Sequence, residues 1–285
     1  HLMGAVGGVY ALLIIKLLGG AGERPNYLPL FASVGGLMAA AVFVLFATVR
    51  EKQAAQVAEE EQGREDAKKD AVGQASGGST VLSAPVKRSM AFLLASILLW
   101  FTAYNAVTTA FSRYSRVVWH MEGGSFADCL MVATVAAIIS YIPIGNIASR
   151  IGRKKTILAG IVLMSVCYFA AIFVGAYHPV INLAFAAIGV GWAAINVNSY
   201  PMIVEMSKGS DIGKFTGTYY TFSMAAQIIT PVLSGFLLEN VSYRTLFPYA
   251  FLFSVLAFLT MTQVRHGDSK PEKKKDMLDN FDVED

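Results

Sequence analysis

The sequence predicts an all-α membrane protein with eight transmembrane helices, and three observations support this fold class. Of the 285 residues, 55% are hydrophobic and only 15% are charged, with a mean hydropathy of +0.51, which is too apolar for a soluble domain. The charged residues lie in a few blocks between long uncharged runs, as a polytopic membrane protein requires. Eight of these runs approach or exceed the roughly 20 residues needed to cross a bilayer.

The eight runs form two groups, with two runs before a charged segment and six after it. In chain order we expect spans near residues 2–19, 28–49, 89–111, 126–148, 156–176, 180–203, 214–238 and 245–264. The two cysteines, Cys129 and Cys167, both fall inside these spans, so we interpret them as packing residues rather than as a disulfide.

The segment 50–88 between the two groups has the composition of a solvated linker. It contains Glu59-Glu60-Glu61, Lys68-Lys69 and a Gly/Ser-rich run, with few apolar residues. It therefore predicts a domain boundary between residues 1–49 and the six-helix bundle 89–264. Residues 265–285, which are rich in Lys, Asp and Glu, predict a solvated tail.

A short basic turn, residues 145–155, separates the fourth and fifth spans. It carries four cations: Arg150, Arg153, Lys154 and Lys155. These charges cannot lie in hydrocarbon, so both spans must end here in water, and Gly145 and Gly152 permit so tight a connection. The positive-inside rule places this turn in the cytoplasm. By alternation the linker and both ends of the chain are then expected to be cytoplasmic.

The six later spans repeat a pattern of polar, mixed and apolar composition. The third and sixth spans carry amides and hydroxyls, whereas the fifth and eighth are almost purely apolar. Three spans reverse the direction of the chain, so the two triplets must be inverted relative to each other. Inverted repeats of this kind are common among secondary transporters.

The basic turn resembles the loop motif of the major facilitator superfamily, Gly-x-x-x-Asp-Arg-x-Gly-Arg-Arg/Lys-Lys/Arg, with Ser149 in place of the acid. Two further runs are similar to signatures of bacterial sucrose-transporter-like carriers: Trp100-Phe101-Thr102-Ala103-Tyr104-Asn105-Ala106-Val107 and Asn196-Val197-Asn198-Ser199-Tyr200-Pro201-Met202. The resemblance implies a carrier of the sugar:cation symporter branch that works by alternating access in a bacterial plasma membrane.

In such carriers the motif follows the second and, more loosely, the eighth span. Here it follows the second span after the linker, so the resemblance implies that this is the later copy in a twelve-helix carrier. Residues 1–49 would then hold the last two helices of the N-terminal bundle, and residues 89–264 the C-terminal bundle. About four spans are expected to be missing from the front.

A charge relay is predicted at the cytoplasmic end. Glu205 is expected at the same depth as Arg150 and Arg153, where a partly dehydrated carboxylate can form charge-assisted contacts with guanidinium groups. The resemblance implies that an acid here holds the inner ends of the spans together, and Glu205 would replace the acid missing at Ser149. Ser149 could still cap the following turn or helix through its hydroxyl. The alternative for Glu205 is a solvated acid past a helix end.

In the third span, Tyr104, Asn105 and Thr108 are candidates for binding solute. Unpaired amides are costly in hydrocarbon, so these side chains must face protein or a water-filled cavity. A carrier of polyols needs amides and hydroxyls for hydrogen bonds and aromatic rings for the apolar face of the sugar. The alternative is interhelical packing.

Later spans supply three more candidates. Asn196 and Tyr200 share a helix face just before Pro201, which breaks the backbone hydrogen bonding. Gln227 belongs to a polar stripe on one face of the seventh span: Thr216, Tyr220, Ser223, Gln227 and Thr230. This stripe predicts either a cavity wall or a polar seam between helices.

The sequence argues against several other classes of function. It shows no enzyme-like nucleophile, metal-binding or phosphate motif, and its basic blocks lack the interleaved aromatics of a nucleic-acid surface. We therefore expect no catalysis, cofactor, metal or nucleic acid; the expected partners are a small solute, membrane lipid and a co-transported cation. No acid lies at mid-depth in a span, so a coupling carboxylate lies outside this chain or is Asp128.

Two other functions remain open at this point. The same architecture serves exporters of drugs or metabolites, and a non-transporting membrane sensor or scaffold could retain it.

Overall fold

The computed structural model describes residues 28–48, 83–122, 125–207 and 212–268, together with Tyr10, Leu13, Ile14 and Leu17. Every regular element in these ranges is helical, which confirms the all-α prediction. The chain divides into two compact units, one containing α2 (Leu28–Thr48) and the other containing helices α4 to α9. The first expected span, 2–19, and most of the expected linker lie outside the described residues.

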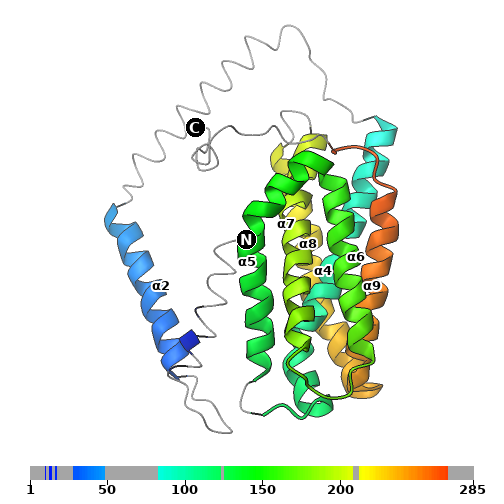
Figure 1. Ribbon diagram of the computed structural model, residues 1–285. Helices are drawn as coiled ribbons and strands as arrows, with labels where there is room; N and C mark the ends of the chain where they lie inside the picture. Colours follow the sequence, from blue (N-terminus) through cyan, green and yellow to red (C-terminus); the bar gives the residue numbers. More distant parts are fainter. Residues whose placement is uncertain are drawn as a thin grey trace. The chain divides into compact units, whose positions relative to one another are not determined.

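The second unit is a bundle of six helices (Figure 1). They are α4 (Ala84–Val118), α5 (Phe126–Ile151), α6 (Arg153–Ile172), α7 (Ile181–Met206), α8 (Ile212–Asn240) and α9 (Leu246–Thr262), with the 3-10 turn η2 (Tyr243–Thr245) before α9. Five of them, and α9 together with η2, are long and apolar enough to cross a membrane. The structure describes the side chains of α2 as far as Val44, and the apolar stretch Leu28–Val44 is shorter than the six candidate membrane spans.

Helix α4 begins five residues earlier than the sequence predicted. Ala84 and Pro85 follow the N-cap residue Ser83, and proline is tolerated in the first turn of a helix because the amide group it lacks has no helical partner there. The last residues of the expected linker, including Lys87 and Arg88, are therefore helical. Helix α4 therefore extends beyond its apolar part and carries these charges in its first turns.

The contacts between the helices are the same when the first three helices, α4 to α6, are exchanged with the last three, α7 to α9. Helix α4 packs against α8 and α9, α7 packs against α5 and α6, and α6 packs against α9. Exchanging α4 with α7, α5 with α8 and α6 with α9 reproduces this list. The contact pattern therefore agrees with the inverted three-plus-three repeat predicted from composition.

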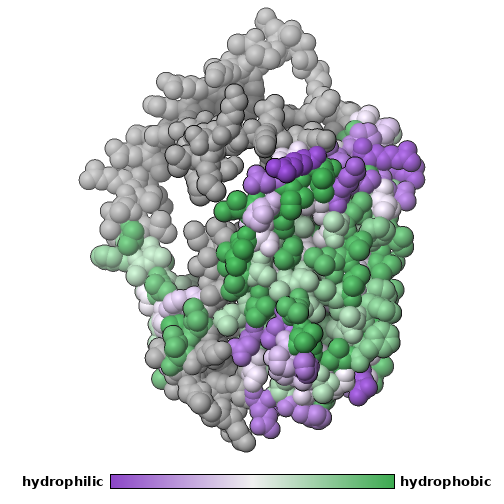
Figure 2. Space-filling model, viewed as in Figure 1, coloured by the Kyte–Doolittle hydropathy of each residue, from purple (hydrophilic) through white to green (hydrophobic). Residues whose placement is uncertain are grey.

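Helices α5 and α8 are the most exposed members of the bundle. Only 22% and 28% of the most apolar stretches of α5 and α8 are buried, against 61% of the corresponding stretch of α4. Ile139 on α5 and Ile228 on α8 leave 69% and 72% of their surface exposed. Figure 2 shows apolar side chains over the visible face between two more polar ends. A wide apolar surface of this kind requires lipid or protein to cover it.

Helix α7 approaches its neighbours closely because small residues lie at the crossings. A Cβ at Gly189 would lie 2.0 Å from the carbonyl oxygen of Ala133 on α5. A Cβ at Gly191 would lie 2.7 Å from the carbonyl oxygen of Gly160 on α6. Such crossings are typical of membrane helices, which gain stability from close van der Waals contact.

We expect Gly189→Ala to lower the thermal stability of the purified complete protein. The new methyl group cannot fit beside the Ala133 carbonyl without moving α5 from α7, and overpacking of this kind costs about 1–3 kcal/mol. Gly145→Ala is the matched control, because a Cβ at Gly145 on α5 meets nothing within 4 Å. A melting temperature unchanged by Gly189→Ala would contradict this packing.

Candidate functional site

An aromatic surface joins α4 and α7 near the middle of both helices. The ring of Tyr104 stacks on Trp192, with centroids 3.8 Å apart and planes 4° from parallel. Phe101 meets the same indole edge-on at 5.1 Å and 82°. Phe101 and Tyr104 are three residues apart, so one face of α4 presents both rings to α7.

Two further helices contribute tyrosines to this region. Tyr104 lies within electrostatic reach of Tyr141 on α5 and of Tyr168 on α6. Together with the nearby amide on α7, these side chains form what we call the central cluster: Phe101, Tyr104, Tyr141, Tyr168, Trp192 and Asn196. The central cluster thus takes its side chains from α4, α5, α6 and α7.

The central cluster contains polar atoms that are buried without a hydrogen-bond partner. The Asn196 side chain donates from Nδ2 to the carbonyl oxygen of Trp192 at 3.0 Å, but its Oδ1 is unpaired. The hydroxyl of fully buried Tyr168 is also unpaired. Buried polar groups are normally paired, because an unpaired group costs about 1–3 kcal/mol. These atoms could form hydrogen bonds with a solute beside an aromatic surface.

Asn105 and Thr108, predicted as solute ligands with Tyr104, differ in how they are paired. The Thr108 hydroxyl lies 3.3 Å from the carbonyl oxygens of both Tyr104 and Asn105, so it is satisfied within its own helix. The Asn105 Nδ2 group is buried without a partner. Asn105 therefore keeps an unused donor, whereas Thr108 does not.

Asn196 and Tyr200, predicted to share one cavity face, lie in different surroundings. Asn196 is in the central cluster, whereas the Tyr200 hydroxyl lies 3.1 Å from Thr216 Oγ1 on α8. The Tyr200 ring also meets Tyr219 edge-on at 5.6 Å. Four residues advance α7 by about 6 Å, so Tyr200 reaches the next contact region along the helix. It joins α7 to α8 nearer the end that carries the basic turn.

Gln227 lies on exposed surface of α8, and its Nε2 donates to the carbonyl oxygen of Ser223 at 3.3 Å. The predicted polar stripe does not form one uniform face. Ser223 and Thr230 are buried, whereas Tyr220 and Gln227 are exposed. The stripe follows the boundary between the packed and the exposed sides of α8.

The basic turn is shorter than the sequence suggested. Helix α5 continues to Ile151 and α6 begins at Arg153, so Gly152 alone connects them, with a φ of 98° that favours glycine. Gly145 lies inside α5 rather than in the turn. The Ser149 hydroxyl donates to the carbonyl oxygen of Asn146 at 2.7 Å and does not cap α6.

An ion pair joins the start of α6 to the end of α7. Arg153 Nη1 lies 2.7 Å from Glu205 Oε2, and the two side chains are 18% and 29% exposed. Of the two arginines predicted near Glu205, Arg153 forms this pair, whereas Arg150 is exposed at the end of α5. Both partners belong to the same bundle, so the pair fixes the relative position of two helix ends within it.

Lys154, predicted as part of the motif turn, makes contacts with the end of α9. Its ammonium group donates to the carbonyl oxygens of Thr262 at 2.9 Å and Val264 at 2.5 Å. Its backbone N–H donates to Asp268 Oδ1 at 2.7 Å. Lys154 is therefore a structural link between α6 and the segment that follows α9.

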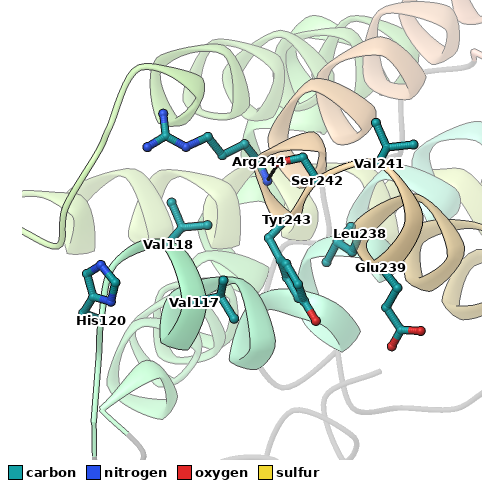
Figure 3. A pocket seen from close by; sticks show the side chains of 9 residues that line it. All are labelled: Val117, Val118, His120, Leu238, Glu239, Val241, Ser242, Tyr243 and Arg244. Carbon is teal, nitrogen blue, oxygen red and sulfur yellow. Dashed lines mark hydrogen bonds between the residues drawn. The ribbon is translucent and has the colours of Figure 1, made fainter.

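A pocket of about 420 Å³ lies at the opposite end of the bundle, between the end of α4 and the α8–η2 corner (Figure 3). Its charged and polar side chains diverge: Arg244 and His120 project to one side, whereas Tyr243 and Glu239 project to the other. Because these groups do not converge, the pocket is a weaker candidate for the solute site than the central cluster.

Sequence reasoning did not identify Trp192, Tyr168 or Asp268 as functional candidates. Trp192 precedes Asn196 by four residues and therefore shares its helix face, a signal that could have identified it. Tyr168 lies in a span that is almost purely apolar, so nothing nearby in the sequence marks it as functional. Asp268 was included in the solvated tail, and nothing near it in the sequence indicates its contact with Lys154.

The chain resembles known membrane transporters. The profile of the Major Facilitator Superfamily matches residues 119–279. The chloramphenicol resistance protein CraA of Acinetobacter baumannii is 28% identical over 116 residues, which cover 41% of this chain and 28% of CraA. An uncharacterized MFS-type transporter of Mycobacterium tuberculosis is 26% identical over 176 residues, which cover 60% of this chain and 24% of the relative. The matched part of the chain thus spans about a quarter of these relatives.

Proposed function

Because the chain belongs to the Major Facilitator Superfamily, a family of membrane transporters rather than enzymes, we propose that it forms part of a secondary transporter for an uncharged polar solute. In this proposal two bundles rock about a central site and expose it to each side of the membrane in turn. Residues 84–262 form the C-terminal bundle, residues 1–49 belong to the N-terminal bundle, and residues 50–83 link the two. The basic turn faces the cytoplasm.

The observation that carries this proposal is the central cluster. The stacked rings of Tyr104 and Trp192 offer an apolar face, and the unpaired Asn196 oxygen and Tyr168 hydroxyl offer hydrogen bonds beside it. No Asp, Glu, Lys or Arg belongs to the cluster, so its chemistry suits a solute without net charge. A sugar has both an apolar C–H face and hydroxyl groups, and we propose it as the solute class.

A second candidate solute class is a neutral drug or metabolite. The relative CraA is named for chloramphenicol resistance. An aromatic surface with few hydrogen-bonding atoms would also accept such a molecule. Cation coupling would require a titratable group, and among the described spans the acids Asp128, Glu205 and Glu239 all lie near helix ends. We therefore place the coupling group outside the central cluster.

Solute counterflow with the complete protein in proteoliposomes tests this proposal. Vesicles loaded with one unlabelled sugar are expected to accumulate the labelled sugar transiently, because a carrier exchanges solute across the membrane. Parallel vesicles loaded with chloramphenicol test the second class, and lipophilic cations serve as the contrasting charged class. Accumulation driven only by lipophilic cations would contradict a site for uncharged solutes, and no counterflow with any class would favour a sensor or scaffold.

A further inference from the structure

The segment that follows α9 folds back over the end of the bundle that carries the basic turn. We call residues 264–268 the C-terminal clasp. The backbone N–H of Arg265 donates to Ser89 Oγ on α4 at 3.2 Å, and His266 Nδ1 lies 2.8 Å from the same oxygen. The sequence assigned residues 265–268 to a solvated tail, but the structure places them against the bundle.

The clasp and the start of α6 cap each other. Asp268 Oδ1 accepts the backbone N–H of Lys154, in the first turn of α6, where the helix dipole favours a negative charge. The Lys154 ammonium group donates to the carbonyl oxygens of Thr262 and Val264, at the end of α9, where a positive charge is favoured. The first turn of α6 thus receives a negative charge from Asp268, and the end of α9 receives a positive charge from Lys154.

The residue that would normally cap α6 cannot do so. Gly152 is the N-cap of α6 and has no side chain, and a Cβ built on it would lie 3.1 Å from Asp268 Oδ1. The Ser149 hydroxyl is bonded within α5. Asp268 therefore supplies the negative charge at this turn from a position 114 residues later in the chain.

The clasp also contacts the end of α7. Gly267 has a φ of 79°, and a Cβ there would lie 2.8 Å from the carbonyl oxygen of Met202 and 3.0 Å from Met206 Cγ. Met202 and Met206 lie on either side of Glu205 in the sequence of α7. One short segment is therefore in contact with both helix ends that the Arg153–Glu205 ion pair joins.

We propose that the clasp is a positioning device for the Arg153–Glu205 ion pair, with Asp268 as its key residue. Asp268 fixes the first turn of α6, which holds Arg153, while Gly267 packs against the turn of α7 that holds Glu205. This inference concerns the regulation of the transporter proposed above and rests on that function for its biological meaning. Its test, however, does not depend on transport.

A double-mutant cycle on thermal unfolding of the purified complete protein provides this test. The melting temperatures of three variants, Arg153→Gln, Glu205→Gln and the double variant, are compared with that of wild type. The coupling between the two side chains is the difference between the shift of the double variant and the sum of the two single shifts. The cycle is repeated in an Asp268→Ala background. We expect the coupling to fall to less than half, because Arg153 loses its fixed position.

Two controls separate positioning from general destabilisation. The Arg113–Glu239 ion pair lies at the opposite end of the bundle, so its coupling should not change with Asp268→Ala. Asp268→Asn keeps an oxygen that can accept the Lys154 N–H, so most of the Arg153–Glu205 coupling should remain in this variant. If Asp268→Ala does not fold, Gly267→Ala replaces it, because a Cβ at Gly267 would push the clasp away from the Met202 carbonyl oxygen. Coupling equal to wild type in Asp268→Ala or in its replacement Gly267→Ala, or a parallel loss at Arg113–Glu239, would overturn the proposal.

Discussion

Replacing Glu205 with glutamine is expected to lower the transport rate of the complete protein by at least about ten-fold, equivalent to about 1.4 kcal/mol. The substitution leaves Arg153, whose side chain is only 18% exposed, without its charged partner. Removing one member of a partly buried pair leaves the other charge uncompensated, which is the costly case. Helix α7 would lose its charged contact with the start of α6, and α7 carries Trp192 and Asn196 of the central cluster. Initial uptake rates in proteoliposomes measure the effect.

Two comparisons sharpen this prediction. The exchanged pair Arg153→Glu with Glu205→Arg should recover part of the activity, because the attraction is restored in reverse. Glu239→Gln is the matched control, since the Arg113–Glu239 pair is also short at 2.5 Å but its side chains are 64% and 56% exposed. Exposed pairs contribute about 0–1 kcal/mol, so transport should change little. Equal losses in Glu205→Gln and Glu239→Gln would show that the Arg153–Glu205 pair has no special role.

Replacing Trp192 with alanine is expected to raise the KM for the solute by at least about ten-fold. The substitution removes the surface on which Tyr104 stacks and which Phe101 meets edge-on. Aromatic pairs contribute about 0.5–1.5 kcal/mol beyond their buried area. A solute that packs on the part of the indole that Tyr104 does not cover would lose that surface as well. Trp192→Phe keeps part of the aromatic face and should have a smaller effect.

Phe173→Ala is the control for the loss of an aromatic ring. Phe173 is 72% exposed and meets Phe169 at the far end of α6, away from the central cluster. Its removal should leave the KM unchanged. If Trp192→Ala changed only the amount of folded protein and left the KM of the remaining protein at the wild-type value, the aromatic surface would be structural.

Features that depend on local composition were predictable from the sequence. The length and apolarity of the six described spans predicted helices because any other backbone arrangement leaves unpaired groups in hydrocarbon. The Arg153–Glu205 contact was predictable because both residues lie at the same end of neighbouring spans. The exact helix start at Ala84 was not, because Lys87 and Arg88 look like linker residues until the helix is seen to extend into water.

Features that depend on contacts between distant residues were not predictable. The stack of Tyr104 on Trp192 requires a particular rotation of α4 and α7, which apolar length does not specify. The position of Tyr200 beside Thr216, rather than beside Asn196, likewise follows from the packing of α7 on α8. The contact between Asp268 and Lys154 spans 114 residues, so no local pattern indicates it.

The most direct test of the central cluster is equilibrium binding of a labelled sugar to the purified complete protein. We expect wild type and Phe173→Ala to bind with the same affinity, and Trp192→Ala to bind at least about ten-fold more weakly, a loss of about 1.4 kcal/mol. If Trp192→Ala protein with a normal melting temperature bound the sugar as tightly as wild type, the solute site would lie elsewhere and the proposed function would lose its structural basis.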